Sequence, residues 1–83
     1  METIEVTEQK LKAVFSDALG IPLSAINDDV AYDKSKGWDS LAHMALISAL
    51  ESAFDIMLDT DDVVDLSSYG KSKEILRKYG VQV

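Results

Sequence analysis

Three side chains of the segment GWDSLAHM, residues 37–44, are of types that could do chemistry: Asp39, Ser40 and His43. If the segment is helical, the spacing of three residues places Ser40 and His43 on neighbouring parts of one face, which raises the question of a hydrolase. A serine hydrolase also needs an orienting carboxylate and an oxyanion pocket that converge on one point. His43 is the only histidine of the chain and would share one small helix with the serine. We therefore expect His43 to be a surface or interface residue that tunes partner choice.

Acidic residues gather between positions 55 and 65 and raise the question of a calcium site. An EF-hand loop counted from Asp59 would place Val64 where the turn needs glycine and Gly70 where the bidentate glutamate belongs. The chain has no cysteine, so disulfides and thiolate metal sites are excluded as well. We expect no metal site, and we interpret these carboxylates as helix caps and solvated surface with a second role in partner docking.

Length and charge indicate one small acidic domain over residues 1–83. A chain of 83 residues can bury only a modest core, which favours a module over a self-contained enzyme. Its net charge of −7 repels phosphate backbones and disfavours nucleic acid as a partner, whereas basic protein surfaces suit it. The N-terminus has no apolar signal segment, and no apolar run is long enough to span a membrane. We expect a cytoplasmic protein that is monomeric in isolation.

Apolar residues recur at three- and four-residue steps in two long segments and predict a helix in each. The first helix is expected to begin near Thr3 or Thr7 and to stop at Gly20. The second is expected to start just after Asp39, whose carboxylate can accept the free amide hydrogens of the first turn, and to end near Asp55. The serine is thus expected in the first turn of a helix.

Two shorter segments complete the helical pattern. Thr60 or Asp61 can cap a short third helix. Ser67 or Ser68 precedes a last helix, for which Gly80 is the C-terminal stop. No segment alternates over enough residues to demand a strand. The expected fold is an all-α, up-and-down four-helix bundle with a short third helix and a long loop between helices one and two.

The long loop, GIPLSAINDDVAYDKSKGWD over residues 20–39, is punctuated by Gly, Pro, Asn and Asp, yet carries apolar residues at intervals. A connection of this length in a small domain is usually either functional or disordered. The spaced apolar residues predict that the loop is pinned against the core, with Trp38 as an anchor at its end.

The helices, the long first loop and the motif Gly37-x-Asp39-Ser40-Leu41 together resemble the acyl carrier protein family over nearly the whole chain. Further matching residues follow the motif in the order that the family shows: Leu46, Ile47, Leu50, Phe54, Asp55 and Ile56. An acidic entry to helix three and a closing amphipathic helix complete the resemblance.

The resemblance implies that Ser40 carries a 4′-phosphopantetheine arm, which a phosphopantetheinyl transferase attaches from coenzyme A. Ser40 itself would catalyse nothing, because the acyl group is held as a thioester on the terminal thiol of the arm. A helix start suits the product, since its unpaired amide hydrogens and dipole favour negative charge. The resemblance also places Asp39 beside the metal-assisted reaction centre of the transferase, in addition to its role as a cap.

The resemblance implies partner enzymes as well: an acyl-loading ligase or acyltransferase, and a ketosynthase or downstream transferase. Many fatty-acid carriers have acidic residues along the exposed face of helix two, whereas here that face is small or apolar. Weaker electrostatic steering changes which partners fit, so we expect recognition by packing more than by charge. The residues expected to contact partners are Leu41, His43, Met44, Ala45, Ser48, Asp61 and Asp62. Lys36, where the family often has a leucine, marks the same departure.

These departures predict a dedicated carrier of a specialised biosynthetic pathway instead of the general fatty-acid carrier. The cargo stays open between acyl, aminoacyl and polyketide units. In fatty-acid carriers the chain folds back into a cavity between the helices, and the possible lining residues here are Val14, Phe15, Ile47, Leu50, Phe54, Val63 and Leu76. The same residues are what a four-helix core needs, so they do not by themselves predict a cavity.

Two functions from other classes remain open at this point. The chain could be an acidic helical interaction module that binds a partner without modification. It could also be a hydrolase that uses Ser40 and His43. Attachment of an arm to Ser40 would distinguish the carrier from both.

Overall fold

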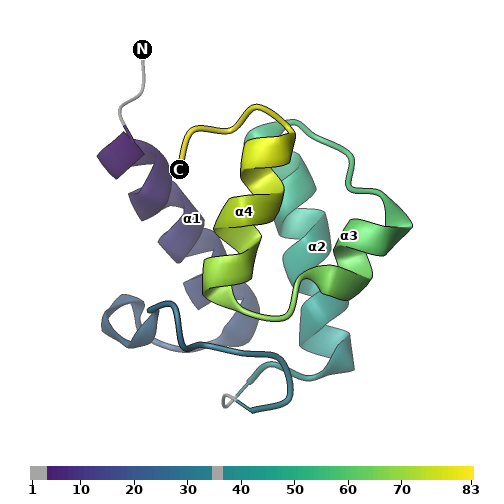
Figure 1. Ribbon diagram of the computed structural model, residues 1–83. Helices are drawn as coiled ribbons and strands as arrows, with labels where there is room; N and C mark the ends of the chain where they lie inside the picture. The colour runs from purple at the N-terminus through teal and green to yellow at the C-terminus, as the bar shows by residue number, and fades with distance from the viewer. Residues whose placement is uncertain (1–3, 35–36) are drawn as a thin grey trace.

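The computed structural model describes residues 4–34 and 37–83, and its main elements are four α-helices (Figure 1). These are α1 (Ile4–Leu19), α2 (Ser40–Phe54), α3 (Thr60–Asp65) and α4 (Tyr69–Lys78), with a 3-10 helix η1 (Leu23–Ala25) in the first loop. Within the described ranges there is no strand, and an isolated antiparallel bridge joins Ala31 to Ser68. The predicted all-α four-helix bundle, with its short third helix and long first loop, is confirmed.

The helix α1 forms because its apolar residues fall on one stripe that packs against α2. Leu11, Phe15 and Leu19 follow one another at steps of four and are buried. Gly20 ends the helix with a φ of 69°, in the left-handed region that glycine adopts without a Cβ penalty. The predicted stop is confirmed.

The helix α2 is the most apolar helix in composition, and it begins and ends where the sequence predicts. Leu46, Ile47 and Leu50 are its buried residues. Asp39 caps the N-terminus, and Asp55 ends the helix in the left-handed conformation with a φ of 53°. The start of α2 is therefore fixed by a side chain of the loop that precedes it.

Of the two predicted starts of α1, Ile4 as its first described residue agrees with a start near Thr3 and not with one near Thr7, and Thr3 itself lies outside the described residues. The start of α3 differs from the expectation. Asp59 occupies the N-cap position of α3, one or two residues before the predicted caps, without a side-chain capping bond. The Asp59 amide instead donates to the hydroxyl of Tyr79, 3.0 Å away. The C-terminal end of α4 thus supplies a hydrogen-bond acceptor at the start of α3, and the predicted side-chain cap of α3 is not formed.

The loop between α1 and α2 crosses the end of the bundle at which α2 begins (Figure 1). Ile26 and Val30 bury their side chains in the core. The Val30 carbonyl accepts from the Tyr69 amide at 2.8 Å, and the Tyr32 amide donates to the Ser67 carbonyl at 2.9 Å. The loop is pinned, as predicted, to the segment that leads into α4.

The helix α4 is capped by Ser68, one of the two predicted residues. The Ser68 hydroxyl accepts from the Lys71 amide at 2.9 Å, in the usual geometry of a serine N-cap. Ile75 and Leu76 are buried on the inner face. Gly80, just beyond the helix, has a φ of 87° and acts as the predicted stop.

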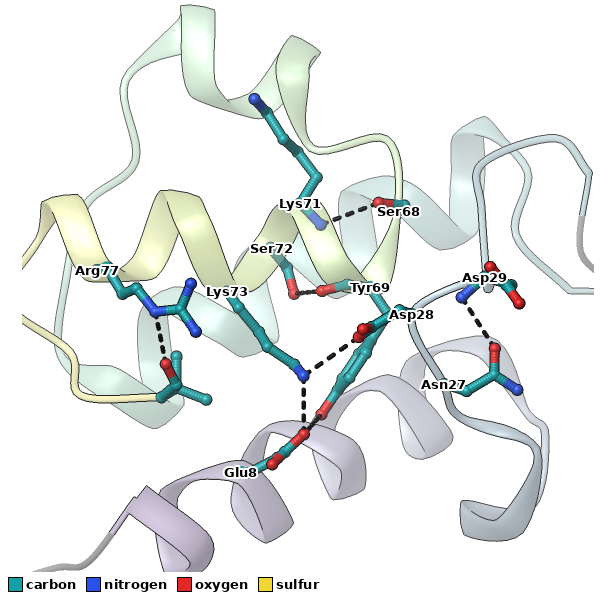
Figure 2. Close-up of polar contacts among 11 residues, drawn as sticks. Glu8, Asn27, Asp28, Asp29, Ser68, Tyr69, Lys71, Ser72, Lys73 and Arg77 are labelled. Atoms are coloured by element: carbon teal, nitrogen blue, oxygen red, sulfur yellow. Dashed lines mark hydrogen bonds and ion pairs between the residues drawn. The ribbon is translucent and has the colours of Figure 1, made fainter.

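A polar cluster ties α4 to α1 and to the first loop (Figure 2). The Lys73 ammonium lies 2.9 Å from the Glu8 carboxylate and 3.2 Å from that of Asp28. The hydrogen bond between Lys73 and Glu8 lowers the pKa of Glu8 and raises that of Lys73. Burial raises the pKa of the nearby Tyr69 hydroxyl, which donates to Glu8 at 3.4 Å. Three segments far apart in the sequence are held together here.

The centre of the core is aromatic. Phe15 of α1 meets Trp38 edge to face with ring centroids 5.5 Å apart, and meets Tyr69 of α4 at 5.0 Å. All three side chains are almost fully buried. Trp38 is therefore the anchor that the sequence predicts at the end of the loop.

Candidate functional site

Ser40 is the first residue of α2, and its side chain is exposed. Asp39 precedes it in an extended conformation, and its carboxylate accepts from the Ala42 amide at 2.9 Å. The Asp39 carbonyl also accepts from the His43 amide at 2.8 Å. The capped end of the helix therefore presents a free hydroxyl beside the positive end of the helix dipole, where a phosphate group is favoured.

Gly37 and Trp38 fix the position of this helix start. Gly37 has a φ of 87°, and a Cβ added to it would lie 2.2 Å from the Leu19 carbonyl oxygen. The backbone of the loop thus passes closely against the end of α1, which only glycine permits. With Trp38 anchored in the core, the two residues before Asp39 have a single well-defined path. The sequence shows Gly37 in its motif but does not reveal this contact.

His43 bridges the loop and α3 and is half-buried, so its role as a surface or interface residue that tunes partner choice stays a prediction. The Trp38 indole N–H donates to Nδ1 at 3.0 Å, and Nε2 lies 2.8 Å from the Val63 carbonyl oxygen. Because the indole nitrogen is only a donor, Nδ1 must accept, and Nε2 carries the hydrogen that is donated to Val63. Neither ring nitrogen is left to act as a base for Ser40.

A cavity of about 270 Å³ has His43 in its lining. Its lining is mainly apolar and comes from the first loop, α2, α3 and the segment after α3: Tyr32, His43, Val63, Val64, Leu66 and Ser67. Since His43 follows Ser40 by three residues, it lies about 4.5 Å further along the helix axis. A group rooted at Ser40 therefore has an apolar cavity within one turn of its attachment point.

Comparison with known proteins identifies the family of this chain. A family model described as "Phosphopantetheine attachment site" matches residues 9–71. The chain is also 32% identical over 72 residues to an acyl carrier protein of Desulforapulum autotrophicum, a match that covers 86% of this chain and 94% of that protein. The chain belongs to the acyl carrier protein family.

Other acyl carriers agree with this assignment. An acyl carrier protein of Clostridium acetobutylicum is 36% identical over 62 residues, which cover 75% of this chain and 80% of the relative. An acyl carrier protein of Buchnera aphidicola is 30% identical over 71 residues, with coverages of 86% and 89%. The resemblance of the motif and helices is thus confirmed over most of the chain.

As a member of the family, the acyl carrier has a non-catalytic role and holds 4′-phosphopantetheine covalently. The terminal thiol of this group can hold an acyl unit as a thioester, which supplies the reactive sulfur that a cysteine-free chain lacks. The family works with phosphopantetheinyl transferases and with acyl-handling enzymes. The start of α2 fits such a group, because the Ser40 hydroxyl is exposed at a capped helix end. None of the helices in the described part of the carrier is long and apolar enough to cross a membrane.

The exposed face of α2 carries most of the residues expected to meet partners. Leu41 is 81% exposed and Met44 is 58% exposed. Ala45 and Ser48 are exposed on the same helix, and Asp61 is exposed at the start of α3. The structure thus leaves these five side chains accessible on the carrier.

In and just before α3, two apolar residues are exposed that sequence reasoning missed. Val64 of α3 is 75% exposed, and Met57, in the turn before α3, is 82% exposed. The signal in the sequence was weak, because α3 is too short for an apolar stripe to separate inner from outer positions. Lys36, at which the sequence departs from the family, lies outside the described residues.

Asp62 is the clearest correction to the predicted partner face. Its side chain is buried, with 4% of the residue exposed. One carboxylate oxygen lies 2.5 Å from the Lys78 ammonium, and the other accepts from the Tyr79 hydroxyl at 2.6 Å. The hydrogen bond from Lys78, followed by that from Tyr79, lowers the pKa of Asp62, and the same contact raises the pKa of Lys78. Asp62 therefore joins α3 to α4 and is not available for docking.

Proposed function

We propose that Ser40 bears the 4′-phosphopantetheine arm and that residues 1–83 form one carrier domain of a specialised, cytoplasmic biosynthetic pathway. The observation that supports this most directly is the exposed hydroxyl of Ser40 at the capped start of α2, within the motif Asp39-Ser40-Leu41. A monomeric carrier would pass between a loading ligase or acyltransferase and a ketosynthase or downstream transferase.

Attachment is a substitution at phosphorus. The Ser40 hydroxyl oxygen attacks the phosphorus of coenzyme A that bears the pantetheine, and a new oxygen–phosphorus bond forms. The bond to the adenosine side breaks, adenosine 3′,5′-bisphosphate leaves, and the serine proton passes to a base of the transferase. Asp39 holds the helix start in place through its bond to Ala42, and its exposed carboxylate is available to the metal-assisted centre of the transferase.

The α2 face supports a dedicated pathway. Leu41 and Met44 are the large exposed side chains that follow Ser40, and the next carboxylate of α2 is Glu51. The Glu51 carboxylate accepts from the Leu58 amide at 2.9 Å, which turns it toward the end of α2. A partner that recognises acidic residues on this helix has little to bind, whereas a partner with an apolar surface finds a match.

The attachment is tested by incubating the apo protein with coenzyme A, magnesium and a broad-specificity phosphopantetheinyl transferase. Intact mass should increase by one phosphopantetheine unit in the wild type and in the control Ser52→Ala, which removes another exposed serine of α2. Ser40→Ala should stay unmodified. No gain in the wild type, or an equal gain in Ser40→Ala, would remove the carrier assignment of this residue and favour an unmodified interaction module.

The choice of partner is tested with Met44→Glu, which restores an acidic side chain on the exposed face. We expect the variant to be loaded faster than the wild type by a malonyl transferase of general fatty-acid synthesis, because charge steers association. The gain should disappear at high salt, where charges are screened. A wild type that this enzyme already loads rapidly and in a salt-dependent way would contradict a dedicated pathway.

A further inference from the structure

The ring of His43 is the outer member of an aromatic stack that is rooted in the core. Its ring plane lies 20° from that of Trp38, with centroids 6.0 Å apart, and Tyr32 covers its edge at 5.4 Å. Trp38 in turn meets Phe15 at 5.5 Å. A chain of ring contacts thus leads from the centre of the bundle to the side of α2 that faces α3.

The same ring spans the space between α2 and α3 by a hydrogen bond. The last carbonyls of a helix have no partner within the helix, and Val63 is among the last four residues of α3. His43 satisfies this carbonyl with its Nε2 hydrogen at 2.8 Å, while Nδ1 accepts from Trp38. If the ring swung away, a buried indole N–H would lose its acceptor and α3 would lose a donor.

The position of this bridge matters for anything attached to Ser40. A chain that starts at Ser40 and enters the seam between α2 and α3 meets His43 after one turn. His43 lines the cavity of about 270 Å³, and of the residues that could line an interior cavity only Val63 borders it. Phe15, Leu50 and Leu76 among them are fully buried in the packed core.

We propose that His43 closes the seam between α2 and α3, so that the carrier presents its cargo outside the bundle and not within it. The first carbons of an acyl unit would contact the cavity formed by Tyr32, His43 and Val64, and the rest would remain accessible to solvent and enzymes. Such a carrier suits short or polar acyl units, since a long alkyl chain gains no shelter. The inference rests on the proposed attachment of the arm to Ser40.

The test uses carriers loaded with acetyl or octanoyl arms by a phosphopantetheinyl transferase from the corresponding acyl-coenzyme A. Intact mass first confirms one acyl-phosphopantetheine group per chain. Neutral hydroxylamine then attacks the thioester carbonyl, which releases the hydroxamate and the free thiol. The rate on the carrier is divided by the rate on the same acyl-coenzyme A. Because cleavage follows the exposed fraction of the thioester, this ratio measures shelter by the protein.

In the wild type we expect the octanoyl and acetyl ratios to agree within about twofold. His43→Ala should open the seam and lower the octanoyl ratio alone, by about fivefold or more. His43→Gln is the matched control, because its amide can accept from Trp38 and donate to Val63, and it should behave as the wild type. The proposal would be overturned by a wild-type octanoyl ratio that already lies about fivefold below the acetyl ratio. A folded His43→Ala with the same octanoyl ratio as the wild type would overturn it as well.

A second measurement on the wild type keeps the test decisive if His43→Ala fails to fold. Amide chemical shifts of the acetyl and octanoyl forms should differ near Val64 and Ser67 and agree at Phe15, Leu50 and Leu76. Differences throughout the core residues would show a buried chain and overturn the proposal. Absence of any mass gain in the loading step would instead refute the attachment to Ser40, and this inference with it.

Discussion

The position of the Ser40 hydroxyl is fixed by the three residues that precede it. Gly37 lets the loop pass against the carbonyl of Leu19, Trp38 anchors in the aromatic core, and Asp39 caps the helix. Ser40 then has to emerge at the helix start with its side chain in solvent. At the scale of residues, the motif therefore has a structural role, because its residues position the serine.

Replacing Gly37 by alanine tests this placement. A left-handed conformation costs a non-glycine residue about 1–2 kcal/mol. Gly20→Ala carries the same conformational cost without a contact, since nothing lies within 4 Å of its added Cβ. Gly37→Ala adds the collision with Leu19, so we expect it to unfold at a lower temperature than Gly20→Ala. Equal melting temperatures of the two variants would contradict a close approach at Gly37.

Asp39 combines a structural and a recognition role that two substitutions can separate. Asparagine caps a helix about as well as aspartate, whereas alanine costs about 0.5–2 kcal/mol of stability. We expect Asp39→Asn to melt near the wild-type temperature yet to accept the arm more slowly, because the carrier no longer offers a carboxylate to the transferase. Thermal melts and initial rates of modification measure the two effects. Wild-type modification of a stably folded Asp39→Asn would assign the residue to capping alone.

The helix α3 illustrates how a short element depends on distant partners. Asp62 is its only buried residue, and this side chain bonds to Lys78 and Tyr79 at the C-terminal end of α4. On the other side, the Val63 carbonyl accepts from His43 of α2. Polar bonds to its two neighbours thus supplement the packing of Val63 against the core in holding the six residues of α3.

The pairing of Asp62 predicts how stability responds to acid. A pKa that is lower in the folded state means that the folded chain binds its proton less readily than the unfolded chain. The contribution is therefore complete above the ordinary value of 3.8 and is lost as the pH falls through the lower, folded pKa. Glu8, paired with Lys73, acts in the same direction from its ordinary value of 4.5. We expect the melting temperature to fall in acid below these values.

Asp62→Asn should melt at a lower temperature than the wild type at neutral pH and should lose less stability on acidification. Asp61→Asn changes the adjacent, exposed carboxylate and serves as the control. Thermal melts over a series of acidic buffers measure both effects. If the acid dependence of Asp62→Asn parallels that of the wild type, the ion pair with Lys78 does not stabilise α3.

Periodicity and capping rules predicted the four helices because these signals are local. Apolar steps of three and four residues and the caps Asp39 and Ser68 are visible within one or two turns. The roles of His43 and Asp62 could not be predicted in this way. Their partners, Val63 and Lys78, follow them by 20 and 16 residues, and only the folded chain brings them together. From the sequence alone, a polar residue on a helix is expected to be solvent-exposed, because its distant partner cannot be identified.

The whole molecule carries a net charge of −7 on a small surface, so like charges repel across it. Ion pairs such as Glu8 with Lys73 offset this repulsion only locally. Surface charges are screened within about 10 Å at 0.1 M salt. Because net repulsion exceeds the local attraction, screening by salt should stabilise the fold.

We expect moderate sodium chloride to raise the free energy of unfolding by about 0.5 kcal/mol, or the melting temperature by about 2–4 °C for a domain of this size. Differential scanning calorimetry at low and moderate ionic strength measures the shift. A melting temperature that stays flat or falls would show that the attractive pairs outweigh the net repulsion.

The attachment of the arm to one serine is the claim on which the function of the whole molecule depends, and locating the arm tests it most directly. Proteolysis of the modified protein, followed by fragmentation of the peptides in a mass spectrometer, assigns the added group to a residue. The structure predicts a single phosphopantetheine group on Ser40. A group found on another serine, threonine or tyrosine of the chain would contradict the account.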